Sequence, residues 1–131
     1  MPLRLIVADD HPGYRRSIGV ALGEVGIEVL AVVEDGVRAL AAAREHAPDV
    51  ALLDLRMPGL GGADVARALR RDGSTTRVLI LSAYAEPELI VHAVQAGVAG
   101  FVSKEASRRE IVAAVNRCAA GEQVLPPGVA V

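Results

Sequence analysis

The chain has 131 residues, of which 52% are hydrophobic, 23% are charged and only 2% are aromatic. That length suits one domain whose core is built from Val, Leu, Ile and Ala. The formal net charge of -2 argues against nucleic-acid binding by this chain itself, and its single cysteine, Cys118, excludes an internal disulfide or a cysteine-based zinc cluster.

The apolar runs and the amino-terminal sequence bear on where the protein works. No apolar run reaches the roughly 20 residues that a membrane span needs. The first residues, MPLRLIVADD, lack the charge layout of a secretory signal peptide. Together with the single cysteine, these features lead us to expect a cytoplasmic protein that does not contact a membrane.

Short apolar runs along the chain predict five β-strands. Most of the runs are nearly continuous rather than alternating, as is typical of strands that are buried on both faces of a parallel sheet. In chain order, the runs cover residues 3–8, 27–33, 50–54, 77–82 and 100–103.

Apolar residues recur at steps of three and four residues between and after these runs, which predicts five helices. The start signals are Pro12, Pro87 and Ser107 with Glu110, and the stop signals are Gly26, Gly97 and Gly121. Gly13 and Gly19 weaken the first helix because glycine lowers helix propensity. The alternation predicts an α/β fold with a parallel sheet and helices on both of its faces.

The segment after the last helical pattern differs in composition from the rest of the chain. It reads EQVLPPGVAV and contains Pro126 and Pro127, which is typical of a linker rather than of another packed element. We therefore expect a packed domain over residues 1–121 and a linker or tail over residues 122–131.

Polar residues stand at or just after the carboxyl ends of four of the five predicted strands. They are Asp9 and Asp10, Asp54, Ser82 and Lys104. Because ligands bind at the carboxyl ends of the strands in open parallel sheets, we expect these side chains to form one site. Clustered carboxylates repel one another unless a cation joins them, and Mg²⁺ is the hard cation that carboxylates and phosphate oxygens hold together. The lysine and the hydroxyl suit a phosphoryl group, which a carboxylate can itself accept.

Four motifs in this order resemble one known family. The sequences ADD, LLDLRMPG, LSA and SK follow the first, third, fourth and fifth predicted strands and resemble the receiver domain of bacterial two-component response regulators. The sequences DDHP and AAGEQVLPP resemble the NarL/FixJ-type subfamily, whose members usually carry a C-terminal helix-turn-helix domain. The resemblance implies a flavodoxin-like, doubly wound (βα)5 fold with a five-stranded sheet in the order 2-1-3-4-5.

The resemblance also implies roles for the acidic residues. Asp54 would accept a phosphoryl group from a sensor histidine kinase. Asp10 and the backbone carbonyl of Arg56 would bind Mg²⁺ beside Asp54, and Asp9 would act on the metal mainly through bound water.

The remaining motif positions would contact or respond to the phosphoryl group. Lys104 would pair with its oxygens, Ser82 would turn toward it and donate a hydrogen bond, and Ala83 would leave room for it. Phe101 falls at the switch aromatic of the family. Since phenylalanine has no hydroxyl group, a switch at this position would act by packing alone.

The function implied by the resemblance is a signalling switch rather than an enzyme with a turned-over substrate. The domain would assist its own phosphorylation and dephosphorylation, and the phosphoryl group would change an interaction surface, with homodimerisation as the expected readout. DNA would be bound only by a C-terminal domain absent from this chain. We expect a fragment of a transcription regulator, with a stand-alone receiver as the alternative.

Two other functions are alternatives to a receiver domain. Phosphatases of the haloacid-dehalogenase type also form an aspartyl phosphate, but they place a D-x-D motif on the first strand, where this chain has the adjacent pair Asp9 and Asp10. A flavodoxin-like cofactor binder would need donors for a flavin phosphate and aromatic side chains to stack on the ring. The acidic edge and the scarcity of aromatic residues argue against it.

Overall fold

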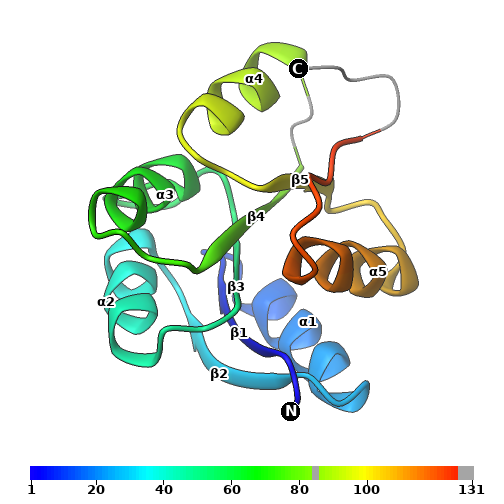
Figure 1. The fold of residues 1–131 in the computed structure, drawn as a ribbon. Coiled ribbons are helices and arrows are strands. Elements are labelled where there is room, and N and C mark those ends of the chain that lie inside the picture. The colour runs from blue at the N-terminus through cyan, green and yellow to red at the C-terminus, as the bar shows by residue number, and fades with distance from the viewer. Residues whose placement is uncertain (84–85, 127–131) are drawn as a thin grey trace.

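The computed structural model describes residues 1–83 and 86–126 as five strands that alternate with five helices (Figure 1). The elements are β1 (Arg4–Ala8), α1 (Pro12–Glu24), β2 (Glu28–Val33), α2 (Gly36–His46), β3 (Val50–Leu53), α3 (Gly62–Arg71), β4 (Arg77–Ser82), α4 (Pro87–Gln95), β5 (Gly100–Ser103) and α5 (Arg108–Ala119). All neighbouring strands are parallel, in the order β2-β1-β3-β4-β5. The predicted fold and strand order are confirmed.

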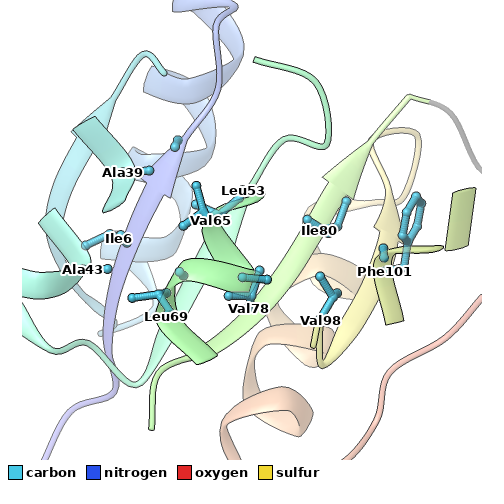
Figure 2. Packing of buried hydrophobic residues seen from close by; sticks show 14 of the residues in the cluster. Ile6, Ala39, Ala43, Leu53, Val65, Leu69, Val78, Ile80, Val98 and Phe101 are labelled. Carbon is cyan, nitrogen blue, oxygen red and sulfur yellow. The ribbon is translucent and has the colours of Figure 1, made fainter. Parts of the chain in front are cut away.

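Helices cover both faces of the sheet, with α1 and α5 on one face and α2, α3 and α4 on the other (Figure 1). The two-residue period of a strand divides its side chains between these layers. In β1, Leu5 and Val7 pack with α1 and α5, whereas Ile6 and Ala8 pack on the opposite face. Figure 2 shows residues of the cluster on the α2–α4 face, among them Ile6 of β1 and Ile80 of β4. Each fully buried Leu or Ile stabilises the fold by about 1.5–3 kcal/mol.

The helix boundaries follow the sequence signals closely. Pro12 and Pro87 stand in the first turns of α1 and α4, and Ser107 and Glu110 form the predicted capping box at the start of α5. The three predicted stop glycines all have a positive φ: Gly26 at 87°, Gly97 at 104° and Gly121 at 96°. No helix within residues 1–83 and 86–126 has the length and apolar character needed to cross a bilayer.

Helix α1 is regular although it contains the glycines that weaken it in the sequence. Gly19 is buried, and a Cβ atom at this position would lie 3.2 Å from Cγ2 of Val32 in β2. The missing side chain therefore lets α1 lie close to β2, and packing against the sheet outweighs the low helix propensity of glycine.

The chain continues to pack against the sheet after α5. The backbone N–H of Phe101 donates to the carbonyl of Val124 at 2.8 Å, and the N–H of Val124 donates to the carbonyl of Ala99 at 3.1 Å. The side chain of Val124 is buried. Val124 therefore packs on the edge of β5, within the segment that the sequence predicts to be a linker or tail, because an edge strand has free backbone groups. Pro127 and the residues after it lie outside the described residues, and a linker to a further domain stays a prediction.

Candidate functional site

The backbone pairing of the sheet continues past the strand ends and brings Asp9 and Asp54 side by side. The N–H of Asp9 donates to the carbonyl of Val33 at 3.1 Å, and the N–H of Asp54 donates to the carbonyl of Ala8 at 2.9 Å. Both carboxylates follow a residue that packs on the α2–α4 face, so the strand period turns them toward the side of α1 and α5. Both residues are buried.

Lys104 joins the two acids. Its ammonium nitrogen lies 2.6 Å from an oxygen of Asp9 and 3.0 Å from Oδ2 of Asp54, and only 13% of its side chain is exposed. The lysine is held at this edge because its backbone N–H donates to the carbonyl of Ser82 at 2.9 Å. Two buried carboxylates thus form ion pairs with the same ammonium group.

Burial and charge oppose each other in this cluster. Burial raises the pKa of Asp54, and the hydrogen bond and positive charge of Lys104 offset only part of this rise. Burial acts to lower the pKa of Lys104, but its hydrogen bonds to Asp9 and Asp54 outweigh burial and leave the pKa raised. Lys104 therefore stays charged at neutral pH, and the ionisation of Asp54 carries a cost in desolvation that a further cation would relieve.

Asp10 and His11 complete an acidic cluster at the solvent side. One carboxylate oxygen from each of Asp9, Asp10 and Asp54 and a ring nitrogen of His11 lie within 4.8 Å of one another. The Nδ1 atom of His11 lies 3.1 Å from the carboxylates of both Asp9 and Asp10. Carboxylate oxygens grouped on an open edge are the ligands that Mg²⁺ takes while it keeps several waters, so the residues present fit this ion.

The loop after β3 folds back tightly onto the strand end. The N–H of Gly62 donates to the carbonyl of Leu55 at 3.0 Å, and a Cβ atom on Gly61 would lie 2.5 Å from the same oxygen. The glycines of the sequence GLGG thus allow the loop backbone to lie close to the backbone of Leu55. The N–H of Arg56 points to Oδ1 of Asp54 at 3.4 Å, which places Arg56 beside the acid. A metal contact through the Arg56 carbonyl stays a prediction.

The remaining predicted positions divide between the edge and the core. Ser82 is fully buried at the end of β4, and Ala83 is exposed directly after it. Phe101 is 1% exposed and packs in the cluster that contains Ile90 of α4 (Figure 2). The structure therefore brings Ser82 to the edge with Lys104, whereas the ring of Phe101 belongs to the core.

Tyr14 lies at the site although the sequence patterns did not single it out. The ring centroid of Tyr14 lies 4.9 Å from the ammonium nitrogen of Lys104. Its position in the first turn of α1, four residues after Asp10, is the signal that could have indicated it. His11 directly follows the acidic pair in the sequence, and its contacts with both carboxylates depend on the folded geometry.

A family model for the response regulator receiver domain matches residues 5–116. Among curated proteins, the transcriptional regulatory protein NarL of Mycobacterium tuberculosis is 46% identical over 128 residues, which are 97% of this chain and 59% of that protein. The response regulator GacA of Pseudomonas viridiflava is 34% identical over 129 residues, which are 98% of this chain and 60% of that protein. The chain therefore spans less than two thirds of the length of these relatives.

A solved structure of similar sequence has the same architecture. The signal receiver domain of the response regulator NarL from Mycobacterium tuberculosis superposes with a TM-score of 0.90 at 46% identity. The match covers 92% of this chain and 98% of that chain.

Proposed function

The chain belongs to the response regulator receiver domain family, whose general function is phosphorylation signalling, and we propose that Asp54 is the residue that carries the phosphoryl group. The observation that supports this proposal best is the ion pair between Asp54 and Lys104, the single lysine of the sequence. Asp54 is a buried carboxylate at a strand end, 3.0 Å from the ammonium group of Lys104 and next to the carboxylate of Asp9. Burial holds the acid in place, and the open edge of the sheet leaves it within reach of a donor.

We propose that Mg²⁺ is the cofactor, held by Asp10 and Asp54 and by the backbone carbonyl of Arg56, with Asp9 acting mainly through bound water. The grouping of the carboxylate oxygens within 4.8 Å supports this assignment. When bound, the ion supplies positive charge that offsets the repulsion between the carboxylates and the phosphoryl oxygens.

The proposed donor is the phosphohistidine of a sensor histidine kinase. An oxygen of the Asp54 carboxylate attacks the phosphorus atom, and an O–P bond forms as the N–P bond breaks. The imidazole nitrogen of the kinase leaves with the electron pair of that bond and takes up a proton. Lys104 stands where its charge can offset that of the phosphoryl oxygens, so the role of this chain is largely positioning and electrostatic stabilisation.

After transfer, the phosphoryl group on Asp54 adds negative charge at the sheet edge. Lys104 pairs with the phosphoryl oxygens, the hydroxyl group of Ser82 donates a hydrogen bond to them, and Ala83 leaves room for the group. Phe101 responds through packing alone, because it has no hydroxyl group and its ring lies in the core cluster that also contains Ile90 of α4. Hydrolysis by water returns the free carboxylate of Asp54, and the domain assists this step as well.

The output of the switch is a changed surface that favours a homodimer and controls a further domain. We propose that residues 122–131 lead to a C-terminal helix-turn-helix domain that binds DNA and regulates transcription in the cytoplasm. The names of the relatives support this proposal, since one is a transcriptional regulatory protein of which this chain spans 59%.

Labelling with a small phosphodonor tests the assignment of Asp54. Wild type and the Asp54→Asn variant are incubated with the donor and Mg²⁺, and Asp64→Asn serves as a matched control on the surface of α3. We expect labelling of wild type and of Asp64→Asn but not of Asp54→Asn. Equal labelling of all three proteins would contradict the proposal.

A further inference from the structure

The ammonium group of Lys104 has a third neighbour besides its two carboxylates. The ring centroid of Tyr14 lies 4.9 Å from Nζ, within the roughly 6 Å over which an aromatic face attracts a cation. Tyr14 comes from the first turn of α1, whereas Lys104 follows β5, so this contact joins two segments that are distant in the sequence.

We propose that Tyr14 is a positioning residue for Lys104, and that its ring holds the ammonium group at the phosphorylation site both before and after Asp54 is modified. This inference rests on the proposed function of Asp54 and adds a residue to it. Within the described residues, the Tyr14 hydroxyl forms no hydrogen bond with Asp54 or with the proposed metal ligands, and its ring faces Lys104, so it acts through Lys104.

Lys104 needs a further contact because phosphorylation and metal binding change its interactions with Asp9 and Asp54. In the free domain, Lys104 is held by Asp9 at 2.6 Å and Asp54 at 3.0 Å. A bound cation and a phosphoryl group on Asp54 both compete for these interactions. The Tyr14 ring is uncharged and has no affinity for the metal, so its contact with Lys104 is the one that phosphorylation leaves in place.

The aromatic ring of Tyr14, rather than its hydroxyl group, makes the contact with Lys104. The Tyr14 hydroxyl is buried and has no hydrogen-bond partner within the described residues. Burial raises the pKa of Tyr14, and the positive charge of Lys104 offsets part of that rise. The side chain is therefore a neutral phenol at physiological pH, and its contact with Lys104 is that of an aromatic face rather than that of a phenolate.

A flexible lysine needs such a support. The four-carbon stem of Lys104 has many rotamers, and a cation that samples them spends little time at the reacting group. Because Tyr14 is partly buried and the Lys104 side chain is only 13% exposed, the attraction between ring and ammonium is stronger than it would be on a fully exposed surface. Removing the ring should therefore release the ammonium group without removing its charge.

Lys104 is the only lysine in the sequence, which makes its position directly measurable. Isotope-labelled lysine gives a single set of side-chain NMR signals, and the Tyr14 ring shifts the ε-methylene signals through its ring current. Tyr14→Phe keeps the ring and removes the hydroxyl group. Tyr14→Leu removes the ring, and Tyr14→Met provides a second ring-free variant with a side chain that adapts to the site if Tyr14→Leu does not fold.

We expect Tyr14→Leu and Tyr14→Met to lose the ring-current shift of Lys104, and Tyr14→Phe to keep it. Phosphorylation by a small donor with Mg²⁺ should slow about five- to tenfold in the ring-free variants and stay within about twofold of wild type in Tyr14→Phe. An unchanged Lys104 signal in the ring-free variants overturns the inference. So does a Tyr14→Phe variant that is slowed as much as Tyr14→Leu, because the hydroxyl group would then be responsible.

The NMR measurement needs no phosphoryl transfer, so the two proposals can fail separately. A wild-type protein that is not phosphorylated on Asp54 but shows the ring-current shift contradicts the proposed function alone. Normal phosphorylation of wild type, with equal rates in all three Tyr14 variants, contradicts the role of Tyr14 alone.

Discussion

Lys104 lies closer to Asp9 than to Asp54, with its ammonium nitrogen 2.6 Å from one acid and 3.0 Å from the other. A single lysine thus supplies the positive charge that the two buried carboxylates need in the free domain. Asp54 is also a proposed metal ligand, and Asp9 is proposed to act on the metal through bound water, so a bound cation would take over part of the role of Lys104. This exchange makes the lysine and the metal interdependent, and it underlies the first prediction.

Replacing Lys104 by Met should destabilise the protein most strongly when divalent ions are absent. Removing one partner of a buried ion pair leaves uncompensated charge, and we expect the free energy of unfolding to fall by about 2–4 kcal/mol in a chelating buffer. Saturating Mg²⁺ should restore much of this loss, since the ion again compensates the carboxylates. Urea unfolding with and without Mg²⁺ measures both quantities.

The matched control for this prediction removes a cation elsewhere. Arg71 is exposed at the end of α3 and forms no ion pair within residues 1–83 and 86–126. Arg71→Met should change the free energy of unfolding by less than about 0.5 kcal/mol in either buffer. Equal losses for the two variants would contradict the role assigned to Lys104.

Replacing Asp54 by Asn should raise the thermal midpoint of the metal-free protein, with an effect that depends on pH. The pKa of Asp54 is raised in the folded state, so the folded state holds this proton more tightly than the unfolded state does. Wild type therefore loses stability as the pH rises from the unfolded pKa, about 3.9, through the raised folded pKa, and the Asn variant does not.

We expect the midpoint of Asp54→Asn to exceed that of wild type at pH 7, and the difference to shrink as the pH falls toward about 4. Thermal melts in a chelating buffer across this range provide the measurement. A variant that is less stable than wild type at pH 7 would show that the pairing with Lys104 outweighs the desolvation of Asp54.

Parts of this site could be predicted from the sequence because they depend on local pattern. The apolar run before Asp54 predicts a buried strand, and the parallel topology then places Asp9, Asp54 and Lys104 at one edge. Tyr14 could not be assigned this way, because its contact with Lys104 depends on how α1 packs beside the end of β5. Val124 was missed for a similar reason: its burial depends on the unpaired edge of β5.

Ser107→Ala should lower the free energy of unfolding by about 1 kcal/mol. The Ser107 hydroxyl accepts from the N–H of Glu110 at 3.1 Å, and the carboxylate of Glu110 accepts from the N–H of Ser107 at 3.1 Å. Chemical denaturation at neutral pH measures the loss. Ser107→Asp, which can still cap the helix, should remain within a few tenths of a kcal/mol of wild type.

The partner residue of this cap adds a pH dependence. The hydrogen bonds from Ser107 lower the pKa of the Glu110 carboxyl in the folded state. The stability from this carboxylate is present above its unfolded pKa, about 4.3, and is lost as the pH falls through the lowered folded pKa. A Glu110→Ala variant should therefore approach the stability of wild type as the solution is acidified, and a constant difference would contradict the cap.

Val124→Ala should destabilise the domain by about 1–2 kcal/mol although it lies beyond the last helix. Its side chain is 5% exposed, and its backbone bonds with Ala99 and Phe101 extend the sheet edge. Val20→Ala is the control, because Val20 is 57% exposed on α1 and should be nearly neutral. Equal effects of the two substitutions on urea unfolding would show that Val124 does not pack with the domain in solution.

The most direct test of the account identifies the phosphorylated residue chemically. Borohydride reduces an aspartyl phosphate to homoserine, so peptide mass spectrometry after phosphorylation and reduction reads out the modified position. We predict homoserine at position 54 of wild type, and none in a Mg²⁺-free reaction. Homoserine at position 9 or 10, or a stable phosphoryl group on another residue type with position 54 unchanged, would contradict the assignment of Asp54.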